Sequence, residues 1–314
     1  MITFSRIVKE EVVLNDFDKC CSKALLMAVI KINGTLSLSS QGLSLTIRTE
    51  NAKIASKLHK MLKGLYNPNI EFLVSRKMKL KKNNVYMLKV TKAREILDDL
   101  ELISNLGFVA IPQMALLKKD CCKRAYLAGA FLSCGSVNNP DTSNYHLEMT
   151  FMDDEYAAFV LELMNYYELH AKMTTRRNKY VVYLKSSEKI GDFLRAIGAS
   201  QSVMQFESTR IDRSMMNTVN RWNNCDIANE VKTMNAANQQ LNDINVIMMF
   251  DSLDTLDEIS RDLCQIRIDN PESTLNEIGV IYEQLNGHPI SKASISRRFK
   301  KVHEMAKSLM KLED

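Results

Sequence analysis

The stretch CCSKALLMAVIKINGTL, which begins at Cys20, returns 101 residues later as CCKRAYLAGAFLSCGSV, which begins at Cys121. At this fixed offset both paired cysteines, an alanine, a leucine and a glycine are identical, and small Ala28 is matched by small Gly129. Self-similarity at a constant offset marks a duplicated structural unit. The sequence therefore predicts two related halves, each opening with a largely apolar helix.

The similarity continues downstream of both helices. The matched segments are SLTIRTENAKIASKL from Ser44 with HLEMTFMDDEYAAFV from His146, and YMLKVTKAREIL from Tyr86 with VYLKSSEKIGDF from Val182. Apolar and polar residues alternate in LSLTI and LEMTF, which predicts strands with one buried face. Each half is expected to run helix, strand, strand, helix, strand, strand, helix, over about residues 18–105 and 119–200.

Small residues predict a close contact between the two opening helices. Ala28 and Gly129 lack bulky side chains, and such residues let helix backbones approach each other. Gly34 and Gly135 stand where the helices should end. We expect both glycines to adopt the left-handed conformation that commonly terminates a helix.

Residues 127–135 read LAGAFLSCG, and the matching residues 26–34 read LMAVIKING. The former resembles the LAGLIDADG signature of homing endonucleases, in which two such helices pack at the centre of a saddle. That resemblance implies a catalytic acid just before each final glycine, holding a divalent metal ion. Here those positions are Asn33 and Cys134, and neither supplies the oxygen anion that Mg²⁺ prefers. We therefore expect vestigial sites, no bound metal and no nuclease activity.

A residual metal-dependent endonuclease remains as an alternative, because an acid elsewhere could replace the missing pair. Asp141 and Asp153 lie nearby in the sequence. At the offsets of 101 and 102, however, their counterparts are Ser40 and Asn51, so neither acid has a symmetric partner.

A second pattern, near the C-terminus, predicts two helices joined by a tight turn. Thr274 and Glu277 form a capping-box pattern for a helix that runs to about Leu285. Gly287 and Pro289 interrupt it, and Ser291 can cap the next helix. That helix places these apolar residues on one face: Ile295, Phe299, Val302, Ala306 and Leu309.

The opposite face of the second helix is basic and polar, as a helix-turn-helix needs for entering a DNA major groove. Arginine can donate two hydrogen bonds to guanine, and lysine suits phosphates. The predicted DNA-binding residues are Ser291, Lys292, Ala293, Ser294, Ser296, Arg297, Arg298, Lys300 and Lys301.

Two further stretches resemble the WhiA family. The connecting segment of that family is similar to NRWNNCDIANEVKTMNAANQQ, which begins at Asn220, and its C-terminus is similar to PISKASISRRFKKV, which begins at Pro289. The resemblance covers nearly the whole chain. It implies a DNA-binding transcription regulator linked to cell division and chromosome segregation, and to sporulation in actinomycetes.

The expected fold is α+β: a duplicated LAGLIDADG-type domain followed by an all-α helix-turn-helix domain. The predicted boundaries are residues 1–215 for the duplicated domain, 216–245 for a helical linker and 246–314 for the DNA-binding domain. Trp222, the only tryptophan, is interpreted as a packing anchor in the linker.

Basic residues are concentrated in the first half. Residues 48–94 contain thirteen lysines and arginines but two acids, whereas residues 121–195 contain nine of each. This segregation favours a surface for a polyanion, although solvated helix faces would look the same. The predicted phosphate contacts are Arg76, Lys77, Lys79, Lys81 and Lys82.

The seven cysteines include no CxxC spacing, so we expect neither a zinc ribbon nor a disulfide framework. No cofactor is expected either. The N-terminal residues lack a signal-peptide pattern and no apolar stretch could span a bilayer, which predicts a cytoplasmic, nucleoid-associated protein without a membrane partner. The expected partner is double-stranded DNA. The alternative is a scaffold that binds a protein partner through the LAGLIDADG-like domain and has only non-specific DNA affinity.

Overall fold

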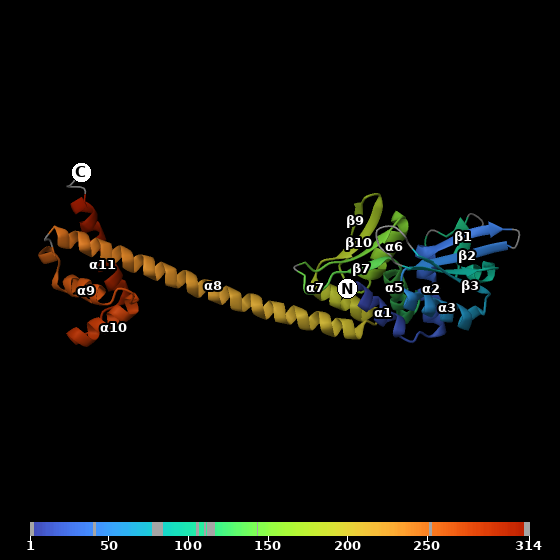
Figure 1. Cartoon of the computed structure of the whole chain (residues 1–314), viewed down its shortest axis with the longest axis horizontal. Helices are drawn as coiled ribbons and strands as arrows, with labels where there is room; N and C mark the ends of the chain where they lie inside the picture. Colours follow the sequence, from blue (N-terminus) through green and yellow to red (C-terminus); the bar gives the residue numbers. More distant parts are fainter. Residues whose placement is uncertain are drawn as a thin grey trace. The chain divides into compact units, whose positions relative to one another are not determined.

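The structure, a computed structural model, describes residues 3–39, 42–76, 84–104, 107–109, 111, 117–142, 144–250 and 253–310. The chain divides into two compact units, Met1–Arg213 and Ser214–Asp314. Figure 1 labels elements of both units where there is room.

The first unit contains the predicted duplication. Its first repeat comprises α2 (Lys19–Asn33), β1 (Gly34–Ser39), β2 (Gly42–Thr49), α3 (Ala52–Tyr66), β3 (Ile70–Arg76), β4 (Asn84–Val90) and α4 (Arg94–Asp99). Its second comprises α5 (Asp120–Cys134), β7 (Gly135–Val137), β8 (Leu147–Phe151), α6 (Asp154–Asn165), β9 (Lys172–Arg176), β10 (Lys179–Leu184) and α7 (Ser187–Ala196). The order of elements predicted for each half is confirmed.

Each repeat forms one four-stranded antiparallel sheet. The strand orders are β1-β2-β4-β3 and β7-β8-β10-β9, which are equivalent. Alternate side chains of the central strands are buried, among them Ile47 beside its partner Leu88, and Met149 beside its partner Val182. This alternation places one face of each sheet on the shared core.

The helices α2 and α5 form the centre of that core. Every residue from 24 to 30 in α2 and from 125 to 132 in α5 is buried. A Cβ atom built on Gly129 would lie 2.5 Å from the Leu25 carbonyl oxygen and 3.0 Å from the Ala28 Cβ. The predicted close approach of the two helices at small residues is therefore confirmed.

The prediction for the glycines that end these helices is wrong. Gly34 and Gly135 have φ of −82° and −76°, so both are extended and lead directly into a strand. A Cβ atom on Gly34 would lie 2.3 Å from the Ile30 carbonyl oxygen, and one on Gly135 would lie 2.2 Å from the Phe131 side chain. Glycine is required at these positions by lack of space, not by a left-handed backbone.

Helix α1 (Phe4–Leu14) ties the start of the chain to the end of the first unit. The Glu11 carboxylate accepts hydrogen bonds from the backbone N–H of Gln201, at 2.6 Å, and from that of Ser202, at 2.9 Å. These two groups belong to the first turn of α8 (Ser200–Met249), whose amides lack partners within the helix. A negative charge there also interacts favourably with the helix dipole.

The short strands β5 (Ile103–Ser104) and β6 (Gly107–Phe108) complete the described part of this unit.

The middle of α8 is open to solvent. Every residue from 221 to 232 is exposed, and the Trp222 side chain has 66% of its surface accessible. The interpretation of Trp222 as a packing anchor is therefore wrong. The helix continues unbroken through this stretch.

The second unit packs the end of α8 against the short 3₁₀ helix η2 (Leu253–Thr255), α9 (Glu258–Asp269), α10 (Leu275–Asn286) and α11 (Lys292–Met310). Its core has contributions from all four α-helices, including Ile244, Leu263, Tyr282 and Phe299. None of the described helices is both long enough and apolar enough to cross a membrane.

Candidate nucleic-acid interface

The turn between α10 and α11 is built as the sequence predicts. The Thr274 N–H donates to the Glu277 carboxylate at 2.6 Å, and the Glu277 N–H donates to the Thr274 hydroxyl at 3.3 Å, which completes the capping box. Gly287 ends α10 with φ of 73°, in the left-handed region. The Ser291 hydroxyl then accepts a hydrogen bond from the Ser294 N–H at 3.2 Å and caps α11.

The inner face of α11 packs against the core of the second unit. Ile295, Phe299, Val302 and Ala306 are at most 4% exposed, and partly buried Leu309 packs against the same core. The predicted apolar face is therefore confirmed.

The outer face of α11 is defined by Ala293, Ser296, Arg297 and Lys300, all of which are exposed. Their spacing of three and four residues places them side by side on one helix surface. Ser291, Lys292 and Lys301 are exposed beside them. The Lys300 ammonium lies 4.0 Å from Glu304, whereas Arg297 forms no ion pair with any residue in the described part of the chain. The face therefore offers cationic groups to an anionic partner.

Arg298 differs from its neighbours because its side chain turns toward α9. Its guanidinium donates to the Asp257 carboxylate and, at 3.2 Å, to the Ser260 hydroxyl. The hydrogen bonds from Ser260 and Arg298 hold the pKa of Asp257 below its usual range. Ser294, another predicted contact, is half-buried. Arg298 thus ties α11 to the start of α9, which sequence periodicity did not predict.

Arg267 is a structural residue that the sequence did not reveal. It is 1% exposed, and its guanidinium donates to the Gln240 side-chain oxygen at 3.0 Å and to the Ser273 carbonyl at 2.5 Å. It also lies 5.8 Å from the centre of the Phe299 ring. These contacts hold the segment between α9 and α10 in place beneath α11. An arginine in an acidic stretch is expected at the surface, so nothing in the sequence predicted that Arg267 is buried.

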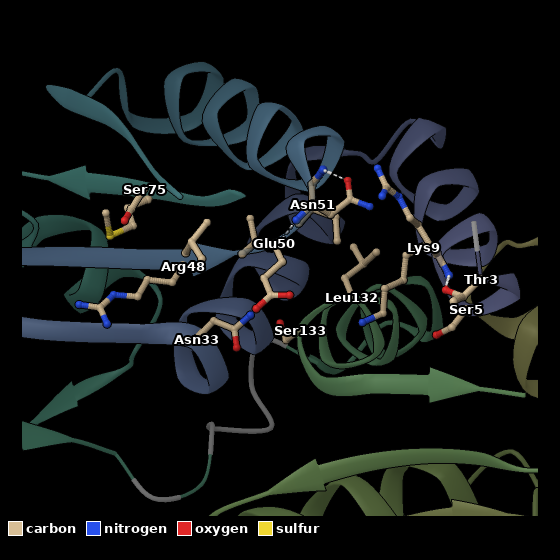
Figure 2. Close-up of a pocket in the computed structure, with 15 residues that line it drawn as sticks. Thr3, Ser5, Lys9, Asn33, Arg48, Glu50, Asn51, Ser75, Leu132 and Ser133 are labelled. Carbon is tan, nitrogen blue, oxygen red and sulfur yellow. Dashed lines mark hydrogen bonds between the residues drawn. The ribbon is translucent and has the colours of Figure 1, made fainter. Parts of the chain in front are cut away.

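The vestigial end of α2 opens into a cavity of about 820 Å³ in the first unit (Figure 2). Asn33 lines this cavity together with the basic residues Arg6, Lys9 and Arg48, and Glu50 is the one acid among its lining residues. Two metal ions on a scissile phosphate need anionic oxygens from both repeats. The donor set lining this cavity does not fit that requirement.

The second vestigial position is also unsuited to a hard metal ion. The Cys134 thiol donates to the Ala130 carbonyl oxygen at 3.4 Å, within its own helix. Burial raises the pKa of this thiol to about 12, an effect that the Lys9 ammonium partly offsets. Burial in turn lowers the pKa of Lys9. Neither Cys134 nor Lys9 supplies the carboxylate that a nuclease needs at this position.

Asp141 and Asp153, the acids that could have replaced the missing catalytic pair, do not line the cavity. The Asp153 carboxylate accepts a hydrogen bond from the Tyr156 N–H at 2.8 Å and caps α6, just as Asn51 caps α3 through the Lys53 N–H at 2.9 Å. Asp141 is exposed in a turn and does not line the cavity. Neither acid therefore adds a carboxylate to the vestigial site.

Among the predicted phosphate contacts, Arg76 is exposed at the end of β3. Lys77, Lys79, Lys81 and Lys82 lie outside the described residues.

Three family models match the chain in order. The WhiA N-terminal LAGLIDADG-like domain matches residues 19–103, the WhiA LAGLIDADG-like domain residues 123–216, and the WhiA C-terminal helix-turn-helix domain residues 219–306. A protein of Bacillus cytotoxicus named "Probable cell division protein WhiA" is 44% identical over 310 residues, covering 98% of this chain and 97% of its own. A protein of the same name from Bacillus thuringiensis is 43% identical over 311 residues, with the same coverage.

Solved structures support the fold. Full-length WhiA from Thermatoga maritima superimposes with a TM-score of 0.59 at 24% identity and covers 96% of both chains. An N-terminal LAGLIDADG domain of WhiA gives a TM-score of 0.50 at 24% identity, over 63% of this chain and 91% of that one. With a duplicated LAGLIDADG-like domain, a C-terminal helix-turn-helix and 44% identity across almost its full length, this chain belongs to the WhiA family.

Proposed function

We propose that this protein is a non-catalytic regulator that binds double-stranded DNA in a sequence-specific manner through α11. The observation that carries the proposal is the division of α11 into a fully seated apolar face and an exposed cationic outer face. The helix-turn-helix match supports it, and the name of the relatives favours a role in cell division. A role in chromosome segregation and a place at the nucleoid are part of the proposal, as the resemblance to the WhiA family implies.

In this proposal the N-terminal half of α11 enters the major groove. Arg297 lies in its second turn and projects from the outer face, so its guanidinium can donate two hydrogen bonds to one guanine. Lys300 and Lys301 lie one turn later and suit the phosphates beside the groove. Lys292, Ala293 and Ser296 contribute the remaining contact surface.

Arg297→Ala is expected to weaken binding to the preferred site by about 1–3 kcal/mol, with a much smaller loss on random DNA, because a bidentate contact reads a base. Lys300→Ala is expected to weaken binding to all sequences alike and to reduce the salt dependence by about one phosphate. Salt-titrated anisotropy with both DNA types measures these effects, once genome-wide mapping of bound DNA has supplied the preferred site. Equal losses on both DNA types for Arg297→Ala would make Arg297 a backbone contact.

Arg298→Ala is the matched control, since it removes the same side chain one position away. It breaks the contacts with Asp257 and Ser260, so we expect the second unit to lose about 1 kcal/mol of stability, discounted for the half-exposed carboxylate. At a temperature where this variant is folded, its preference for the specific site should be retained.

The protein is expected not to cleave DNA with Mg²⁺ or Mn²⁺, because Asn33 and Cys134 replace the paired acids. Incubation with supercoiled plasmid and either metal tests this. Cleavage that disappears in a Glu50→Gln variant would show that the one acid lining the cavity supports a residual endonuclease, and would contradict the proposal.

The second candidate function, a scaffold for a protein partner, is favoured by exposed apolar side chains on α8. They include Ile211, Met215, Trp222, Ile227 and Val231, each at least 49% exposed. If binding to DNA showed no sequence preference at any salt concentration, this candidate would replace the first.

Two predictions from the sequence remain part of the proposed function. One is that residues Arg76, Lys77, Lys79, Lys81 and Lys82 contact DNA phosphates. The other is that the domains comprise residues 1–215, 216–245 and 246–314.

A further inference from the structure

Four cysteine thiols meet where helices α2 and α5 begin. The Sγ atoms of Cys20, Cys21, Cys121 and Cys122 all lie within 4.8 Å of one another. The Sγ atoms of Cys20 and Cys21 are 4.0 Å apart. Each repeat contributes the same adjacent pair at the second and third positions of its helix, so the cluster follows the internal duplication. We call these four residues the tetracysteine cluster.

The separations suit one tetrahedral metal ion. A Zn–S bond of about 2.3 Å places the sulfurs of a tetrahedral site about 3.8 Å apart. The thiols of the cluster therefore need to move inward by no more than about 1 Å to reach that geometry. A multi-iron cluster would hold its thiolates farther apart than these sulfurs lie.

The position of the cysteines at two helix N-termini suits anionic ligands. All four cysteines lie in the first turns of α2 and α5, where the helix dipoles favour negative charge. Thiolates that hold a cation would therefore lie at the favourable end of both helices.

Access and burial also fit a metal site. Cys21 and Cys122 are buried, Cys20 is half-buried and Cys121 is exposed, which leaves one side open for an ion to enter. No other group of three or more histidine, cysteine or acidic side chains with this proximity occurs among the residues that the structure describes.

We propose that the tetracysteine cluster binds one Zn²⁺ ion as a tetrathiolate site that clamps the two repeats together. Binding converts four thiols to thiolates and releases their four protons to solvent. The ion links α2 to α5 at their first turns. Asn33 lies 13 residues beyond Cys20, so the clamp is about 20 Å along the helix from the vestigial site. Its role is structural, because four protein ligands leave no open position for substrate.

The test uses the full-length protein, purified under reducing conditions in buffer free of added metal. Elemental analysis should find about one zinc per chain. The double variant Cys20→Ser/Cys121→Ser removes the two less buried ligands, one from each repeat, and should reduce zinc content at least about tenfold. Cys225→Ser is the matched control, because Cys225 is an exposed thiol on α8 outside the cluster, and it should retain zinc.

Two measurements on the unaltered chain keep the test independent of how the double variant folds. Titration with a mercurial should release zinc in proportion to four thiols modified, as read by a chromogenic chelator. Removal of the ion should lower the melting temperature of the first unit by about 5–10 °C, and added Zn²⁺ should restore it. Cobalt in place of zinc should give the visible bands of a tetrahedral thiolate complex.

Three results would overturn the proposal. One is metal-free protein with reactive thiols at all four positions and a melting temperature that Zn²⁺ does not change. The second is disulfide bonds between these cysteines, found by mass spectrometry of protein kept under the same reducing conditions. The third is stoichiometric iron with charge-transfer absorption in place of zinc.

Discussion

Replacing Phe299 with alanine is expected to unfold the second unit and to abolish sequence-specific DNA binding. Phe299 is 4% exposed in the core formed by α8, α9, α10 and α11, and its ring lies against the buried Arg267 guanidinium. Removing a buried phenyl ring costs about 3–5 kcal/mol. That is a large part of the 5–15 kcal/mol by which a domain is typically stable.

Calorimetry of the full chain is the measurement, because the two units can then be followed as separate transitions. The transition of the first unit should be unchanged, and that of the second should be lost or move far down in temperature. Arg297→Ala is the control: its side chain is exposed, so the second unit should melt as in the unaltered protein. A Phe299→Ala protein with normal melting and weakened binding would mean that Phe299 contacts DNA.

Replacing Gly129 with valine is expected to destabilise the first unit by about 3 kcal/mol, near the upper end for overpacked cores. The first added carbon would already lie 2.5 Å from the Leu25 carbonyl oxygen, and valine adds two more methyl groups. Both contacting helices are central and buried, so α2 and α5 would have to move apart. Chemical unfolding of the full chain, followed by circular dichroism, measures the loss.

Gly64→Val is the matched control for that prediction. Gly64 lies within α3, and a Cβ atom there would meet nothing within 4 Å. The same substitution should therefore change stability by no more than about 0.5 kcal/mol. If both variants lost equal stability, the cause would be valine in a helix, and the close packing of α2 on α5 would not be the explanation.

The order of elements could be predicted from the sequence because the information is local or repeated. Alternation in LSLTI and LEMTF marks one buried face on a strand, and the spacing of Ile295, Phe299 and Val302 marks one buried face on α11. The capping pair Thr274 and Glu277 lies within one helical turn. The repeat then implies that what holds for one half holds for the other.

Sequence reasoning missed the roles that depend on a distant segment. Periodicity placed Arg298 among the DNA contacts but could not show that Asp257, 41 residues earlier, lies beside it. Gly34 and Gly135 resemble helix-ending glycines, yet both are required because the preceding helix turn leaves no room for a side chain.

The cysteines show most clearly the difference between what the sequence determines and what the tertiary structure decides. Their spacing in the sequence argued against a metal site, since ligand motifs are recognised by residues close together in the chain. The sequence alone determined that an identical cysteine pair opens each repeat. Only tertiary structure decided that the two pairs meet, because the small residues at Ala28 and Gly129 let α2 and α5 pack closely and bring their first turns into contact.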